Sequence, residues 1–224
     1  MAKQLGFDLP SRTALGRDAF FVAPTNAMAL AMIENWATWA GGKLVLTGPE
    51  GSGKTHLTHV WADMTGAKII AATDLNNADI PALATGAVAV EDVPRIANDP
   101  ASQTALFHLH NLVLAERHPL LLTGALPVPR WGLSLPDLTS RVAAATAVAL
   151  DPPDDALLSA LLVKLLADRQ LTPKPELIPY LLSRMDRSFA AAIELIDQLD
   201  TASIAQKRPI TRHLAAQVLD NDTQ

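Results

Sequence analysis

The sequence Gly48-Pro49-Glu50-Gly51-Ser52-Gly53-Lys54-Thr55 has the spacing G-x-x-x-x-G-K-[ST], which is the pattern of a phosphate-binding loop. The apolar run at 44–46 before it has the size of a buried strand. Residues 56–64 after it carry Leu57, Val60 and Trp61 at helical spacing. Strand, glycine loop and helix in this order are the context that the motif requires. The alternative, a glycine turn followed by Lys-Thr by chance, does not account for the flanking segments.

The residue types in this loop suit phosphate chemistry. Its glycines adopt backbone angles closed to other residues, so successive N–H groups can point at phosphate oxygens beside a helix N-terminus. Lys54 is expected to reach the outer phosphates, and the Thr55 hydroxyl to hold Mg²⁺. We therefore predict a nucleotide-binding set of Gly48, Pro49, Glu50, Gly51, Ser52, Gly53, Lys54, Thr55 and His56.

Composition narrows the class of protein. The chain has 224 residues, of which 49% are hydrophobic, so it can bury one good core or a core plus a small second domain. Cysteine is absent from the sequence, which excludes disulfides and thiolate metal sites. A net charge of −5 disfavours a broad basic surface for nucleic acid. No apolar run approaches membrane-spanning length and residues 1–4 lack a signal-peptide core, so we expect a cytoplasmic protein.

Two acids follow the apolar segment 87–90, which is apolar on both faces as a central parallel strand should be. Glu91 and Asp92 then lie at the C-terminal end of that strand, where open α/β sheets place their ligands. We expect Glu91 to hold Mg²⁺ and Asp92 to orient the attacking water. The alternative is a pair of acids at the start of a surface loop.

Strands and helices alternate through the first two thirds of the chain. Expected strands at 44–46, 67–70, 87–90, 120–123 and 147–150 are separated by helices that include 25–39 and 102–117. This alternation predicts an α/β fold with a parallel sheet and right-handed crossovers. Beyond the boundary at 151–155 only helices are expected, so we predict an arm at 1–24, a phosphate-loop α/β domain at 25–150 and an all-α domain at 151–224.

This arrangement resembles an AAA+ domain, in which an α/β core precedes a small helical lid, and more narrowly the DnaA-type group that initiates bacterial replication. The resemblance rests on three segments, Asp18-Ala19-Phe20-Phe21-Val22, Gly51-Ser52-Gly53-Lys54-Thr55-His56-Leu57 and Leu135-Pro136-Asp137-Leu138-Thr139-Ser140-Arg141. DnaA continues into a helix-turn-helix domain that this sequence lacks. The resemblance therefore implies no direct sequence-specific binding of DNA.

Within that group the chain looks most like the Hda family of regulatory inactivators of DnaA. The residues concerned are Gln4-Leu5-Gly6-Phe7-Asp8-Leu9, Asp186-Arg187 and the segment 197–204. The resemblance implies that Gln4, Leu5, Phe7 and Leu9 dock in the sliding clamp of the replicative polymerase. It also implies that the clamp-bound protein stimulates hydrolysis of DnaA-bound ATP and so prevents re-initiation. The pattern alone equally allows Leu5, Phe7 and Leu9 to pack on the protein's own core.

Arg141 matches the arginine finger of the family, a residue that acts in trans on a nucleotide bound by a neighbouring subunit. The alternative is an arginine paired with a carboxylate at a helix end. The chain also departs from the family, because the polar sensor expected after strand 120–123 falls on Ala125 and the lid arginine falls on Ala190. These departures predict weak intrinsic ATPase activity without loss of nucleotide binding.

Two classes of function follow from these observations. The first is a regulatory adaptor that binds ADP or ATP with Mg²⁺, is tethered to the clamp and acts on DnaA. The second is an autonomous AAA+ ATPase, such as a helicase loader, or a small-molecule kinase with the same loop. A DnaA paralogue with another partner is a third possibility. Self-association and the choice between ADP and ATP stay open at the level of sequence.

Overall fold

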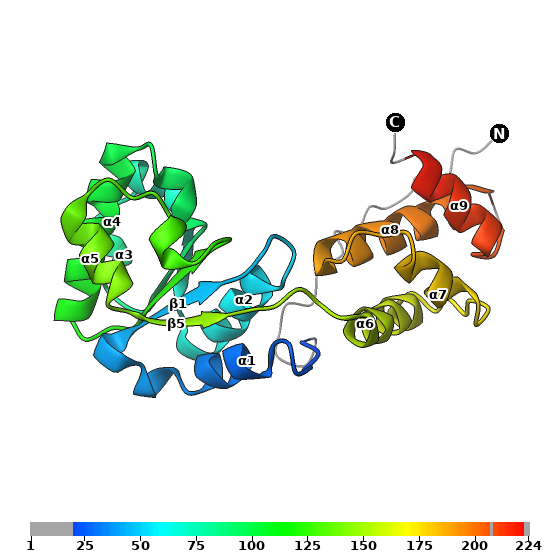
Figure 1. The fold of residues 1–224 in the computed structure, drawn as a ribbon, viewed down its shortest axis with the longest axis horizontal. Coiled ribbons are helices and arrows are strands. Elements are labelled where there is room, and N and C mark those ends of the chain that lie inside the picture. Colours follow the sequence, from blue (N-terminus) through cyan, green and yellow to red (C-terminus); the bar gives the residue numbers. More distant parts are fainter. Residues whose placement is uncertain (1–19, 207, 222–224) are drawn as a thin grey trace, which may run out of the picture.

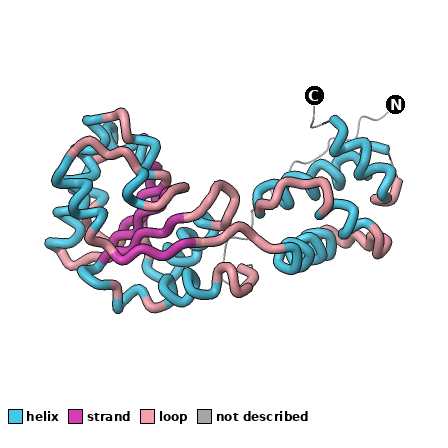
Figure 2. The backbone as a smooth tube through the Cα atoms, viewed as in Figure 1, coloured by secondary structure: helices cyan, strands magenta, loops and turns pink. Residues whose placement is uncertain are grey.

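The computed structural model describes residues 20–206 and 208–221. Its sheet has five strands, β1 (Lys43–Thr47), β2 (Lys68–Ala71), β3 (Val88–Glu91), β4 (Leu120–Gly124) and β5 (Thr146–Ala149). The strands are parallel and lie in the order β2-β3-β4-β1-β5, with Val45 of β1 opposite Leu122 of β4 and Ala147 of β5. Figures 1 and 2 show the sheet in the larger, N-terminal part of the molecule. The predicted α/β architecture is confirmed.

Helices pack on both faces of this sheet. They are α1 (Ala27–Glu34), α2 (Lys54–Thr65), α3 (Ile80–Leu83), α4 (Pro100–Ala115) and α5 (Pro136–Ala143). One core joins Val45, Val90 and Leu122 of the strands to α4 and α5. The other joins Leu44 and Leu121 to α1 and α2. Alternate strand residues therefore enter opposite cores, which explains why the strands read as continuous apolar runs.

The helix expected over 25–39 is shorter than predicted. Helix α1 ends at Glu34, and the side-chain amide of Asn35 donates to the carbonyl of Ala31, in competition with the helical backbone. A 3-10 turn, Trp36–Thr38, follows. It places Trp39 in the core, where its ring stacks on Trp61 at a centroid distance of 5.2 Å. The burial of Trp39 outweighs the helical periodicity of the segment.

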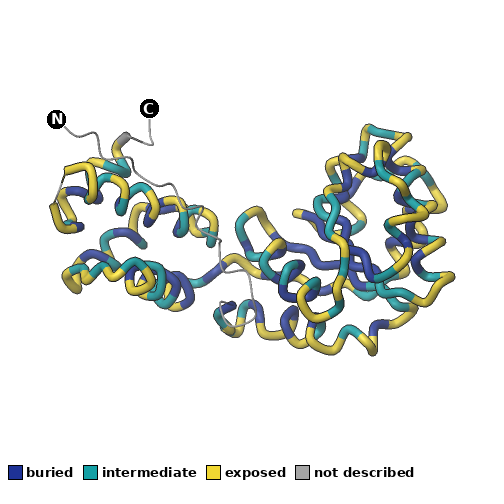
Figure 3. Tube along the Cα trace, turned by 180° about the vertical axis from the view of Figure 1, so that it is seen from behind, coloured by how far each residue is buried: buried dark blue, intermediate teal, exposed yellow. Residues whose placement is uncertain are grey.

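The C-terminal part is helical, as predicted. Its helices are α6 (Asp155–Asp168), α7 (Leu177–Leu182), α8 (Phe189–Gln206) and α9 (Arg212–Asn221). They enclose a separate core that includes Leu158, Leu162, Leu181 and Ile196. Figures 1 and 3 show this helical lid beside the α/β body, with buried residues concentrated along the strands and on the inner helix faces.

The first described residues join the two parts. Phe20 is buried in the core beneath α1 and α2, whereas its neighbour Phe21 packs against the core of the lid. Both residues fall in the segment 1–24 that the sequence assigns to an arm. The packed structure is therefore already present at residue 20. Within the described ranges, no helix is long and apolar enough to cross a membrane.

Candidate nucleotide-binding site

The phosphate loop connects the end of β1 at Thr47 to the start of α2 at Lys54. Gly51 and Gly53 have φ angles of 71° and 97°, in the left-handed region that favours glycine. Gly53 is the residue that directly precedes the helix. The glycines are thus required by the turn that brings the backbone N–H groups and the N-terminus of α2 to one place.

Lys54 points back into this loop. Its Nζ donates to the carbonyl oxygens of Gly48 and Pro49, both at 2.8 Å, and the residue is only 9% exposed. Burial lowers the pKa of the Lys54 ammonium, while the charges of Asp92, Glu50 and Glu91 act in the opposite direction. The ammonium is therefore held at the mouth of the loop, at the position that a phosphate oxygen would contact.

Two buried polar atoms near the loop have no hydrogen-bond partner in the part of the chain that the structure describes, and they indicate whether a nucleotide fits here. The hydroxyl of Ser52 and the Oε1 atom of Glu91 are buried and form no hydrogen bond within the described residues. Buried polar atoms are normally paired, so an exception calls for a ligand, a water or an ion. Donors and acceptors at this edge of the sheet thus fit a phosphate group with an associated cation.

A cavity of about 440 Å³ lies over the loop and extends to the lid. Its walls come from the loop and the start of α2, from the segment after β3, from the residue after β4 and from the start of α8. The lining residues are Glu50, Gly51, Gly53, Lys54, Thr55, His56, Asp92, Pro94, Arg95, Ala125, Phe189, Ala190 and Ile193. Four parts of the chain that are distant in sequence therefore meet at one site.

The lid contacts the phosphate loop directly through a backbone hydrogen bond. The backbone N–H of Phe189 donates to the carbonyl of Gly51 at 3.0 Å. A Cβ atom built on Gly51 would lie 2.8 Å from the hydroxyl of Ser188 and nearer still to its Cβ, so glycine is required for this approach. Ser188 also caps α8, because its Oγ accepts from the N–H of Ala191 at 3.0 Å. The N-terminal end of α8 is thereby directed at the cavity.

The two alanines expected at the sensor positions lie in this same cavity wall. Ala125 follows β4, and Ala190 lies in the first turn of α8. Each contributes only a methyl group, so neither side chain can hydrogen-bond to a phosphate.

Asp92, the acid that follows β3, is held by a residue that the sequence did not indicate. Asp92 has a left-handed backbone with a φ of 56°, and its N–H donates to the hydroxyl of Thr123 at 3.1 Å. Its carboxylate is 4.0 Å from the guanidinium of Arg95. Thr123, which is buried in β4, thus orients the backbone that presents Asp92 to the cavity. The polar side chain of Thr123 in an otherwise apolar strand is the one sequence feature that could have indicated this role.

A cation here would not be held by protein groups alone. Among the described residues, no group of three or more His, Cys, Asp or Glu side chains has the geometry of a metal site. Mg²⁺ is usually held by one or two carboxylates together with substrate phosphates. Thr55 and Glu91 are therefore suited to a cation that arrives with a nucleotide.

Arg141 lies elsewhere. It is an exposed residue at the end of α5, with its guanidinium 5.3 Å from the centroid of the Phe107 ring. Its carbonyl accepts from Nζ of Lys43 at 2.7 Å. Lys43 begins β1 and the phosphate loop follows the other end of that strand, about 16 Å away by the usual rise per strand residue. No ion pair joins Arg141 to a carboxylate within residues 20–206 and 208–221.

Known proteins match both parts of the chain. Residues 154–219 match the family model described as "Hda, lid domain". Domain III of the Thermotoga maritima replication initiation protein DnaA superposes with a TM-score of 0.78 at 16% identity, over 92% of this chain and 96% of that one. The chain therefore has a DnaA-like AAA+ fold, and its lid matches the lid of Hda.

Other solved structures share the fold of this AAA+ protein. DnaA from Aquifex aeolicus bound to AMPPCP gives a TM-score of 0.66 at 21% identity, over 83% of this chain and 65% of that one. The Thermotoga maritima RuvB Holliday junction branch migration motor gives 0.70 at 18% identity, over 92% and 71% of the two chains. At such identities these likenesses establish the fold alone.

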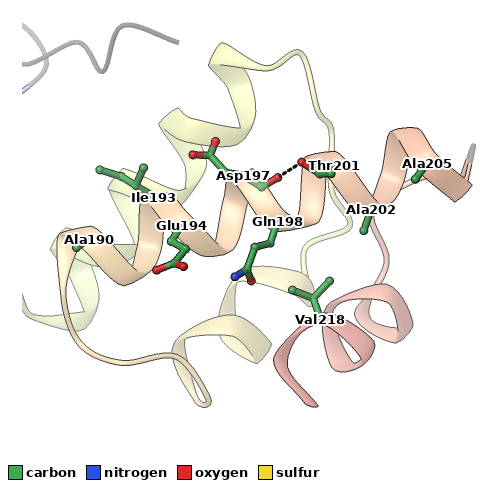
Figure 4. Close-up of a pocket in the computed structure, with 9 residues that line it drawn as sticks. All are labelled: Ala190, Ile193, Glu194, Asp197, Gln198, Thr201, Ala202, Ala205 and Val218. Atoms are coloured by element: carbon green, nitrogen blue, oxygen red, sulfur yellow. Dashed lines mark hydrogen bonds between the residues drawn. The ribbon is translucent and has the colours of Figure 1, made fainter. Parts of the chain in front are cut away.

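The AAA+ protein has a second hollow on its lid, of about 760 Å³, which the sequence did not predict. It follows helix α8 and includes Val218 of α9 (Figure 4). Ala190 and Ile193 line both this hollow and the nucleotide cavity. Asp197 and Thr201 lie along it, with the Thr201 hydroxyl donating to the Asp197 carbonyl at 2.8 Å. Helix α8 thus borders both hollows.

The structure brings only part of the predicted site together, and Gly48, Pro49, Ser52 and Glu91 are not among the residues that line the cavity. Loop residues Glu50, Gly51, Gly53, Lys54, Thr55 and His56 line one cavity together with Asp92. His56 also meets the ring of Phe20 edge-on at 5.2 Å between centroids. Arg141 lies at the other end of the sheet. The predicted clamp-binding residues Gln4, Leu5, Phe7 and Leu9 lie outside the described residues.

Proposed function

We propose that this protein is a negative regulator of replication initiation that stimulates hydrolysis of ATP bound to DnaA. The observation that carries the proposal is the position of Arg141, which is exposed and separated by the length of the sheet from its own Lys54. Because Arg141 lies at the far end of β1 from the phosphate loop, we assign it to a nucleotide held by another molecule. The match of 154–219 to the Hda lid supports DnaA as that molecule.

The nucleotide of the protein itself has a structural role in this proposal. DnaA from Aquifex aeolicus binds AMPPCP, which supports ADP or ATP as the ligand of the cavity here. Lys54 and the loop N–H groups would bind the phosphates, while Thr55 and Glu91 would hold Mg²⁺, which neutralises phosphate charge when bound. The lid contact through Phe189 closes the cavity. Ala125 and Ala190 leave the phosphates without two polar contacts, so intrinsic turnover is slow.

The arm supplies the connection to the clamp. Leu5, Phe7 and Leu9 provide apolar anchors for an extended peptide, and the amide of Gln4 can donate and accept. Such a tether need not bind tightly, because it raises the local concentration of the AAA+ body near its target. Arg141 then stabilises the charge that develops on the phosphoryl group of DnaA-bound ATP.

The test is a single-turnover assay of DnaA loaded with labelled ATP. We expect hydrolysis to accelerate when the protein with ADP and the DNA-loaded clamp are both present. The double variant Leu5→Ala with Phe7→Ala should lose the effect of the clamp and keep its melting temperature. If DnaA hydrolyses its ATP at the same rate with and without the protein, the proposal is wrong.

A further inference from the structure

Lys43 occupies an unusual place for a lysine. Its Nζ donates to the carbonyl of Arg141 at 2.7 Å, and on its other side it lies 3.3 Å from Nε2 of His110. An ammonium has no free lone pair, so Nε2 must be the acceptor in the second contact. Nδ1 then carries the ring proton and donates to Oδ1 of Asn111, 3.4 Å away. One chain of hydrogen bonds thus connects α4, the start of β1 and the end of α5.

The surroundings of Lys43 oppose a positive charge. Burial, and then the neighbouring charge of Arg141, lower the pKa of the Lys43 ammonium. His110 is 2% exposed, and burial together with the charge of Lys43 lowers the pKa of its imidazole to about 4, so the ring is neutral near pH 7. The neutral ring and the carbonyl at the negative end of helix α5 are the two groups that accept from the ammonium.

We propose that Lys43 is a positioning residue for Arg141, fixing the last turn of α5 so that the guanidinium stays over the ring of Phe107. In this arrangement Arg141 faces outward in one orientation rather than many, which is the condition for a group that must meet a reacting phosphoryl in another molecule. The consequence for DnaA rests on the function proposed above. The placement of Arg141 itself can be tested on this protein alone.

A simpler role for Lys43 would be to stabilise the end of a helix, and the chain offers a matched control for it. Lys68 is likewise the first residue of its strand, β2, and its Nζ donates to the carbonyl of Ala82 in helix α3 and lies 3.1 Å from the hydroxyl of Thr85. Lys68→Met therefore removes the same kind of bond at a site remote from Arg141.

The experiment compares Lys43→Met, Lys43→Arg and Lys68→Met in two measurements. The first is the maximal rate of DnaA-bound ATP hydrolysis and the protein concentration that gives half of it. We expect Lys43→Met to lower the maximal rate at least tenfold, because small misplacements of a catalytic group cost about that much or more. The half-saturating concentration should change little, Lys43→Arg should recover most of the rate, and Lys68→Met should behave as wild type.

The second measurement is the NMR resonance of the Arg141 side-chain Nε–H in the protein alone, assigned with Arg141→Lys. A guanidinium over a ring face is shifted upfield, and we expect Lys43→Met, but not Lys68→Met, to move the signal toward the free-arginine position. If Lys43→Met lowers the melting temperature more than Lys68→Met, Lys43→Gln, which is one bond shorter, replaces it. An unmoved Arg141 signal overturns the positioning role. A wild-type protein that fails to stimulate DnaA refutes the proposed function alone, because the NMR result still decides the placement.

Discussion

Replacing Gly51 by alanine tests the contact between the phosphate loop and the lid. The φ angle of Gly51 is 71°, so alanine there pays about 1–2 kcal/mol of left-handed strain. Its Cβ would lie 2.8 Å from the Ser188 hydroxyl and nearer still to the Ser188 Cβ, where ordinary contact begins near 3.4 Å, so the lid must retreat by more than the 0.6 Å that the hydroxyl alone requires. That movement weakens the 3.0 Å bond from Phe189 N–H to the Gly51 carbonyl, worth about 0.5–1.5 kcal/mol.

Gly41→Ala separates the two effects. Gly41 has a nearly equal φ of 63° and nothing within 4 Å of a built Cβ, so its alanine variant has the backbone strain without a steric contact. In urea unfolding followed by tryptophan fluorescence, we expect Gly41→Ala to lower the free energy of unfolding by about 1–2 kcal/mol. Gly51→Ala should cost about 1 kcal/mol more, from the lost hydrogen bond.

A second substitution, at Ser188, should restore the stability that Gly51→Ala loses through its contact with the lid. Ser188→Gly removes the side chain that the new Cβ meets, and glycine at such a capping position costs only a few tenths of a kcal/mol. Gly51→Ala with Ser188→Gly should therefore recover the excess loss and the affinity for ADP. Equal effects of Gly51→Ala and Gly41→Ala, with no recovery in the double variant, would refute the contact as the reason for glycine.

Three further predictions concern the nucleotide site and the buried histidine. Lys54→Ala should lower the affinity for ADP at least tenfold in calorimetry, because it removes a charge-assisted phosphate contact, and unchanged affinity would contradict the site. ATP turnover by the protein alone should stay far below the median enzyme rate of about 10 per second, because Ala125 and Ala190 offer no polar group; several turnovers per second would contradict this. The pKa of His110 falls from 6.5 in the unfolded chain to about 4 in the fold, so the unfolded state gains the proton first as pH drops. Stability should decline between about pH 6.5 and 4, and His110→Gln should flatten that decline in pH-dependent urea unfolding.

Most of the fold could be predicted from local patterns in the sequence. The phosphate loop was predictable because its glycines, Lys54 and Thr55 perform their roles within one contiguous turn. The strands were predictable because burial on both faces demands uninterrupted apolar residues. The helix ending at Glu34 was not, because Trp39 leaves the helical path to stack on Trp61, and that partner is known only from the tertiary structure.

The parts of the site that escaped prediction depend on contacts between segments distant in sequence. Thr123 supports Asp92 from the neighbouring strand, and Ser188 approaches Gly51 from the lid. Nothing in the local sequence around either residue indicates its partner. The resemblance to a known family was enough to single out Arg141. The distance between Arg141 and Lys54, in contrast, follows only from the direction of β1 in the structure.

The most direct measurement of the central claim is single-turnover hydrolysis of DnaA-bound ATP with Arg141→Ala. Arg184→Ala is the matched control, since Arg184 is also exposed and lies 4.1 Å from an aromatic centroid, that of Tyr180, on the lid. We predict that Arg141→Ala binds ADP as wild type does yet loses the stimulation, which for such fingers amounts to roughly 10³–10⁵ in rate. Arg141→Lys should fail too, because lysine lacks the planar fork. Stimulation by Arg141→Ala equal to that of wild type and Arg184→Ala would contradict the account.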